Sequence, residues 1–85
     1  MKKKIHIEYY AILREERKVN KETVETEAST AKELYNELRK KYNFSLETGR
    51  LQLAINDEFC NWQTSLKTGD HIIFIPPVAG GRNSM

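Results

Sequence analysis

The sequence has few of the residues that mark several common protein classes. Cys60 is its single cysteine, so no internal disulfide can form, and no run approaches the roughly 20 apolar residues that a membrane-spanning helix needs. The run Lys2-Lys3-Lys4 is followed by alternating polar and apolar residues instead of an apolar block, so we expect no export signal. These absences predict a cytoplasmic protein that makes no contact with a membrane.

The chain also lacks a strong excess of charge of either sign. Fourteen Lys and Arg residues stand against 12 Asp and Glu residues, a formal net charge of +2, which is too small to indicate a nucleic-acid partner. With 85 residues and 39% hydrophobic content, the chain has room for one domain with one packed core. A deep catalytic cavity is not expected in so small a domain.

The usual side-chain constellations of enzymes and metal sites are missing as well. There is no Ser-centred elbow, Walker loop or paired-cysteine motif. We expect His6 and His71 to be structural or solvent-facing, and Cys60 to be unreactive because no His or helix N-terminus is near it in sequence to lower its pKa. The sequence therefore predicts neither a metal site nor a stably bound cofactor.

What is present is a clear alternation of strand and helix periods. Ile5, Ile7 and Tyr9 alternate with polar residues over 4–10, and the segment 23–26 is β-branched, so a hairpin-like pair of strands is expected around a charged connection at 14–20. Thr30 and Glu33 have capping-box spacing and predict the start of a helix. The apolar face of that helix comprises Ala31, Leu34, Tyr35, Leu38 and Tyr42.

Three further strands are expected in the second half of the chain. Leu51, Leu53 and Ile55 alternate, Asn56-Asp57 supplies a turn before a strand at 59–62, and the strand 71–75 is apolar enough to lie in the middle of the sheet. The order ββαβββ predicts an α+β protein with a β-grasp, ubiquitin-like fold, a mixed sheet packed on one main helix. We expect this domain to span 1–77 and a flexible tail to span 78–85.

The tail contains Gly80-Gly81, whose chemistry would use the backbone carboxylate instead of a side chain. Two glycines allow an extended peptide to enter a narrow channel where any Cβ would collide. An ordinary flexible tail would have the same composition, so the pair alone indicates little.

Longer segments resemble the family of molybdopterin synthase small subunits, the MoaD family. The block LKTGDHIIFIPPVAGG at 66–81, the segment YYAILRE at 9–15 and the segment GRLQLAIN at 49–56 carry this resemblance, which spans residues 4–81. It implies a sulfur carrier within a heterotetramer. An E1-like, MoeB-like enzyme would adenylate the Gly81 carboxylate with ATP, and a sulfur donor protein would convert it to a thiocarboxylate. The sulfur would then pass to cyclic pyranopterin monophosphate during molybdenum cofactor biosynthesis.

The resemblance also implies a docking surface for the MoaE-like large subunit beside the tail. Besides Gly80 and Gly81, the expected site residues are Tyr10, Arg14, Phe59, Ile75, Pro76, Pro77 and Val78. Tyr10 falls opposite Ile5, Ile7 and Tyr9, which favours exposure, whereas alternation does not decide whether Phe59 and Ile75 are core or interface. Arg14 matches the arginine of the family's LRE segment and is either a partner contact or surface charge.

Three alternatives share parts of this pattern: a ThiS-type carrier for thiamine synthesis, a ubiquitin-like modifier of lysines, and a plain interaction domain. The sequence departs from the family by continuing past Gly81 with Arg82-Asn83-Ser84-Met85. Four extended residues add roughly 13 to 14 Å. We therefore predict either that a protease trims the chain after Gly81, or that this protein is an untrimmed or altered form without sulfur-carrier activity.

Overall fold

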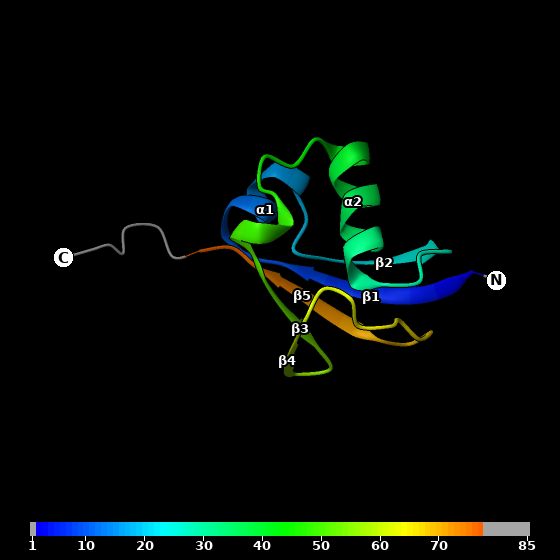
Figure 1. Ribbon diagram of the computed structural model, residues 1–85. Coiled ribbons are helices and arrows are strands. Elements are labelled where there is room, and N and C mark those ends of the chain that lie inside the picture. The colour runs from blue at the N-terminus through cyan, green and yellow to red at the C-terminus, as the bar shows by residue number, and fades with distance from the viewer. Residues whose placement is uncertain (1, 78–85) are drawn as a thin grey trace.

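The computed structural model describes residues 2–77 and has one mixed sheet with its helices on one side (Figure 1). In chain order the elements are β1 (Lys3–Tyr9), α1 (Ala11–Arg17), β2 (Lys21–Thr26), α2 (Ala31–Tyr42), the short 3-10 helix η1 (Thr48–Arg50), β3 (Gln52–Ile55), β4 (Glu58–Cys60) and β5 (His71–Ile75). The predicted division into 1–77 and 78–85 stays a prediction, because residues 78–85 lie outside the described residues. Within residues 2–77, no helix has the length and apolar character needed to cross a membrane.

The sheet has the strand order β2-β1-β5-β3-β4. β1 and β5 run parallel, and the other neighbouring pairs are antiparallel. The apolar strand β5 lies in the middle, as its composition predicted, because a strand with two neighbours and a helix layer above it is the best shielded from water. The α+β class and the β-grasp fold are confirmed.

The main helix α2 begins where its sequence predicts. Thr30 Oγ1 accepts the Glu33 backbone N–H at 3.3 Å, as the capping-box spacing predicts. Glu33 Oε1 accepts the N–H of Ser29 at 2.8 Å, one residue before the N-cap, instead of the Thr30 N–H that a capping box uses. The helix ends at Tyr42, and its C-cap residue Asn43 adopts the left-handed conformation with φ 63°. The buried residues of α2 are Ala31, Leu34, Tyr35 and Leu38, while Tyr42 is only half-buried.

Aromatic rings fill the space between α2 and the sheet. The Phe74 ring on β5 meets the Tyr35 ring edge-on, with centroids 5.0 Å apart, and stacks on the Trp62 ring at 5.8 Å. The Tyr35 hydroxyl donates to the Leu46 carbonyl at 2.8 Å, and burial raises the pKa of Tyr35 to about 12. The polar tip of a core aromatic is thus satisfied and uncharged.

The turn before β5 is held by Asp70, which is buried although it is charged. Its carboxylate accepts the Lys67 N–H at 2.8 Å and the Asn56 amide at 3.0 Å, and the Asn56 side chain in turn accepts the His71 N–H at 3.0 Å. Gly69 adopts φ 92°, a conformation that a residue with a Cβ rarely adopts. The Leu-x-x-Gly-Asp sequence therefore ties the β3–β4 hairpin to the start of β5.

Two boundaries predicted from the sequence are wrong. The segment 14–20, expected to be a charged connection, is largely occupied by α1, because Leu13 inserts into the core while strong helix formers surround it. The strand expected at 59–62 is β4 (Glu58–Cys60), because Trp62 leaves the sheet to stack on Phe74. The observed order therefore has a short helix between the first two strands.

Candidate functional site

The candidate functional site lies at the end of the sheet where β5 leads toward the Gly-Gly segment. β1 and β5 are parallel and Tyr9 pairs with Phe74, so Tyr10 and Ile75 follow at the same end of the sheet. Two short helices flank this end: α1 follows Tyr10, and η1 precedes β3, whose Gln52 pairs with Ile75 (Figure 1). We call Tyr10, Ile75, Pro76 and Pro77 the tail-proximal end.

A shallow groove of about 390 Å³ lies beside this end. Its lining residues are Gly49, Arg50, Leu51, Gln52, Ile75, Pro76 and Pro77, of which only Arg50 is charged. The two prolines have no backbone N–H and cannot extend the ladder, so β5 stops at Ile75 and the chain is free to leave the sheet. A groove with this lining suits contact with protein more than it suits binding of a polar small molecule.

The side of the sheet away from the helices carries an apolar row. Ile72 and Phe74 are buried under the helices, so the alternating residues Ile73 and Ile75 point to the other side, where both are half-buried. Ile73 pairs with Ala54, and Ala54 pairs with Phe59, which is 75% exposed. We call Ile73, Ile75, Ala54 and Phe59 the open face.

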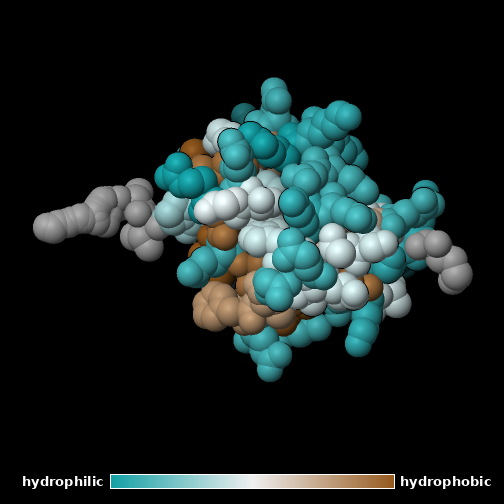
Figure 2. All heavy atoms as spheres, viewed as in Figure 1, coloured by the Kyte–Doolittle hydropathy of each residue, from teal (hydrophilic) through white to brown (hydrophobic). Residues whose placement is uncertain are grey.

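The surface coloured by hydropathy agrees with this placement (Figure 2). On the visible side, brown and tan residues gather over the β3–β4 region toward the end of the molecule where β5 terminates. Elsewhere this view is dominated by hydrophilic and intermediate residues. A 75% exposed phenylalanine next to half-buried isoleucines is the kind of apolar surface that protein partners cover.

The site residues predicted from the sequence lie in four places. Tyr10 is 42% exposed and Ile75 half-buried at the tail-proximal end, where Pro76 is buried and Pro77 exposed. Phe59 lies two strands from β5, and its exposure excludes the alternative that it belongs to the core. Arg14 is exposed on α1. Val78, Gly80 and Gly81 lie outside the described residues.

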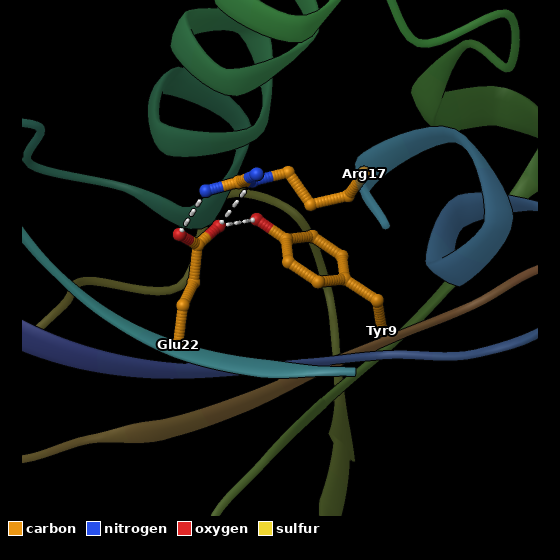
Figure 3. A network of polar contacts seen from close by, with 3 residues as sticks. All are labelled: Tyr9, Arg17 and Glu22. Atoms are coloured by element: carbon orange, nitrogen blue, oxygen red, sulfur yellow. Dashed lines mark hydrogen bonds and ion pairs between the residues drawn. The ribbon is translucent and has the colours of Figure 1, made fainter. Parts of the chain in front are cut away.

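A polar cluster that sequence reasoning missed holds α1 next to this end (Figure 3). The Glu22 carboxylate on β2 accepts the Tyr9 hydroxyl at 2.5 Å and two N–H groups of Arg17, at 3.0 and 2.8 Å. The available signal was the position of Glu22, which alternates with Lys21 and Thr23 and so faces the core side of an edge strand. A carboxylate there needs a cationic partner.

The electrostatics of the cluster follow from this contact. Burial by itself raises the pKa of the Glu22 carboxyl, but hydrogen bonds from Arg17 and Tyr9 outweigh it, so the pKa lies below its ordinary value. The pKa of the Tyr9 hydroxyl is raised, first by burial and then by the hydrogen bond to Glu22. The triad is therefore a tyrosine, a carboxylate and a guanidinium in fixed charge states at neutral pH.

The two histidines, distant in sequence, are neighbours in the sheet. His6 pairs with His71 in the register of β1 and β5. The His6 Nδ1 lies 2.9 Å from the Thr23 hydroxyl, and the His71 Nε2 lies 3.2 Å from the Glu8 carboxylate.

Over residues 2–77, no group of three or more His, Cys, Asp or Glu side chains is placed to hold a metal ion. The Cys60 thiol is half-buried and donates to the Glu58 carbonyl at 3.3 Å.

Comparison with known structures supports the same fold. A chain in the protein-protein complex of subunits 1 and 2 of the molybdopterin-converting factor from Helicobacter pylori is 30% identical, with a TM-score of 0.62, and the match covers 92% of this chain and 99% of that chain. The small archaeal modifier protein 1 from Methanosarcina acetivorans has a TM-score of 0.76 and a match covering 95% and 99%. At 20% identity, its likeness concerns the fold alone.

Comparison of sequences identifies the family. A curated relative, the molybdopterin synthase sulfur carrier subunit of Haemophilus influenzae, is 32% identical over 80 residues, which cover 91% of this chain and 99% of the relative. The profile of the ThiS family matches residues 7–81, a span that runs from β1 through Gly81. A match over most of the chain, together with this relative, establishes that the chain belongs to the ThiS/MoaD family.

Proposed function

We propose that this chain is the sulfur-carrier subunit of a molybdopterin synthase and that Gly81 carries the sulfur. The observation that carries the proposal is the 32% identity to a sulfur carrier subunit whose whole length it matches, within a family match that extends to Gly81. The reactive group is then the main-chain carboxylate of Gly81. This agrees with the shallow, largely uncharged surface at the tail-proximal end, which offers little for binding a small substrate.

The chemistry requires activation by another protein. A carboxylate is a poor acyl donor until one of its oxygens becomes part of a good leaving group, and adenylation by a MoeB-like, E1-like enzyme with ATP provides AMP as that group. A sulfur donor protein supplies the sulfur that replaces AMP, and the resulting thiocarboxylate donates it to cyclic pyranopterin monophosphate. In this scheme ATP is bound by the activating enzyme, and the carrier contributes only its terminus.

The large subunit is proposed to dock on the open face and the tail-proximal end. The exposed Phe59 ring, the half-buried Ile73 and Ile75 and the 42% exposed Tyr10 support this surface, because they form apolar area next to the point where the chain leaves the sheet. The Helicobacter pylori complex of subunits 1 and 2, at 30% identity, supports a partner of this kind. Docking here would aim residues 78–81 into the partner's active site.

The four residues after Gly81 set a condition on the proposal. Near-attack geometry tolerates errors of about 1 Å, and an extension of roughly 13 to 14 Å would carry the terminus far beyond the partner's reacting atoms. We therefore propose that Arg82-Asn83-Ser84-Met85 is removed before activation. Unless it is removed, Asn83 and Met85 would have to fit a channel shaped for glycine.

A reconstitution with purified, protease-free components tests both statements. Full-length protein and protein ending at Gly81 are each incubated with a MoeB-like enzyme, ATP and a sulfur source, and the intact mass of each is measured. Replacement of one oxygen by one sulfur in the shorter form alone is the expected result, followed by pterin conversion when the large subunit is added. Equal thiocarboxylate formation by both forms would refute the trimming requirement.

Other outcomes of the same experiment would identify the alternatives. Sulfur gain without pterin conversion indicates a ThiS-type carrier, and adducts to lysines of other proteins indicate a ubiquitin-like modifier. If no form gains sulfur, the chain is an interaction domain and the proposed function is wrong. Intact mass of the protein from its native cell would report the true C-terminus independently.

A further inference from the structure

The short helix α1 has few local features that would stabilise it. It has seven residues, its N-cap residue Tyr10 makes no capping hydrogen bond through its side chain, and its first turn has no acidic residue. Isolated helices shorter than about 12 to 15 residues are marginal in water. In addition, Ala11 adopts φ 53°, a left-handed conformation that alanine rarely adopts and that persists only when surrounding contacts enforce it. The placement of α1 therefore depends on its tertiary contacts.

The most shielded polar contact of α1 is made to one carboxylate. Glu22 on β2 receives two hydrogen bonds from the Arg17 guanidinium, near the end of α1, and one from Tyr9, just before α1 (Figure 3). The Arg17 guanidinium also lies 4.0 Å from the centre of the Tyr42 ring on α2. Glu22 thus ties the C-terminal end of α1 to the sheet through Arg17, while Tyr9, the last residue of β1, holds the carboxylate in place. The two parallel hydrogen bonds from the guanidinium fix the orientation of the contact as well as its distance.

A second connection is weaker. The Glu16 carboxylate accepts the Ser45 N–H at 3.1 Å and the Ser45 hydroxyl at 2.8 Å, but both bonds are exposed to solvent. In contrast, the side chains of Arg17 and Glu22 are only 24% and 15% exposed. Exposed contacts compete with water and contribute less than shielded, charge-assisted ones. The contact between Arg17 and Glu22 is therefore the principal polar connection of α1 to the sheet, and we call it the Glu22 tether. The buried Leu13 is the apolar anchor of the same helix.

The helix carries residues of the candidate site. Tyr10 immediately precedes α1, and Ile12 and Arg14 are exposed on it. We propose that Glu22, acting through Arg17, is a positioning residue that holds α1 so that Tyr10, Ile12 and Arg14 meet the large subunit. This inference rests on the proposed function, because it assumes that the large subunit covers the tail-proximal end. Glu22 itself need not touch the partner.

The first test measures the positioning directly in the free, full-length protein. Glu22→Gln removes the charge and keeps the shape, and it should speed amide hydrogen exchange in residues 11–18 while leaving the middle of α2 unchanged. Glu37→Gln is the matched control, because Glu37 is also a carboxylate joining a helix to β2, through a 2.9 Å hydrogen bond from the Thr26 hydroxyl. Unchanged exchange in α1 of Glu22→Gln would overturn the proposal.

The second test measures the affinity of each full-length variant for the purified large subunit by titration calorimetry. If α1 without the Arg17–Glu22 contact occupies its binding position about a tenth of the time, the apparent affinity for the large subunit falls about tenfold. Arg17→Lys keeps the positive charge but cannot donate the two parallel hydrogen bonds of a guanidinium, so it should have a similar effect. The double variant should bind about as weakly as either single variant, because both changes break one tether. Glu37→Gln should bind as the wild type does.

The possible failures are distinguishable. If the wild type does not bind the large subunit, the proposed function is wrong and this inference falls with it. If the wild type binds and Glu22→Gln binds equally well at a temperature where both are folded, only the positioning role is wrong. Should Glu22→Gln fail to fold, Arg17→Lys carries the same test, and unchanged affinity of that variant would also refute the proposal.

Discussion

The two sides of the sheet differ in how far their aromatic residues are buried. On the helix side, the rings of Tyr9, Tyr35, Phe44 and Phe74 pack against one another and are almost fully buried. On the open face, Phe59 is 75% exposed, and the half-buried isoleucines of β5 lie across Ala54 from it. One side of the same strands stabilises the fold, and the other has apolar surface left for a partner.

This difference explains how so small a protein can fold and also bind. A domain of this size has a limited core, so every ring on the helix side matters for stability. The open face contributes less to folding, because its side chains remain partly in water in the free protein. Substitutions on the two sides should therefore separate stability from association.

The largest effect is expected from Phe74→Ala on β5. The substitution removes the ring that contacts Tyr35 and Trp62, and truncation of a buried phenylalanine costs about 3 to 5 kcal/mol of unfolding free energy. Urea denaturation followed by circular dichroism measures this loss. The adjacent Ile73→Ala, on the open face of the same strand, should cost clearly less. Equal losses would mean that the two sides do not differ as described.

A smaller loss is expected from Asp70→Ala at the turn before β5. It leaves the Lys67 N–H and the Asn56 amide without their acceptor in a buried site, for which about 1 to 3 kcal/mol is typical. Thermal unfolding of this variant is compared with that of Asp57→Asn, which removes the negative charge of an exposed turn residue. A Tm drop of the same size in both would contradict a specific role for Asp70.

The Glu22 tether predicts a pH dependence on the helix side. Because the folded-state pKa of Glu22 is lowered, its stabilisation is complete above the ordinary glutamate value of 4.5 and is lost as pH falls through the lower, folded value. Glu22→Gln should lower the free energy of unfolding at neutral pH by about 1 to 2 kcal/mol. The gap between wild type and variant should close in strong acid. A gap that is constant with pH would exclude this titration as its cause.

The sequence predicted the helix side better than the site. Period and capping correctly indicated the strands, α2 and the central position of β5, because these features depend on local pattern and apolar content. They missed α1, whose placement depends on Leu13 reaching the core and on Glu22 binding Arg17 across the fold. Such contacts exist only after the chain has folded.

The candidate site was predictable in its residues but not in its arrangement. Tyr10 could be placed outside the core from alternation alone, whereas the exposure of Phe59 follows from a pairing with Ala54 that no local pattern reveals. The proximity of His6 and His71 likewise results from the parallel pairing of two strands at opposite ends of the sequence. The partner-binding roles of Tyr10 and Phe59 stay predictions.

The smallest effect on stability is expected from Phe59→Ala on the open face. Because its ring is mostly in water, the free energy of unfolding should change by less than about 0.5 kcal/mol. The same change should weaken binding of the large subunit by about 1 to 2 kcal/mol, since an aromatic anchor that becomes covered gains the burial that it lacks in the free protein. Denaturation and calorimetry on the same samples measure the two quantities. Val19→Ala, an exposed apolar residue after α1, is the control and should change neither one. A variant Phe59→Ala that unfolds more easily but binds normally would assign the ring to the fold and remove it from the interface.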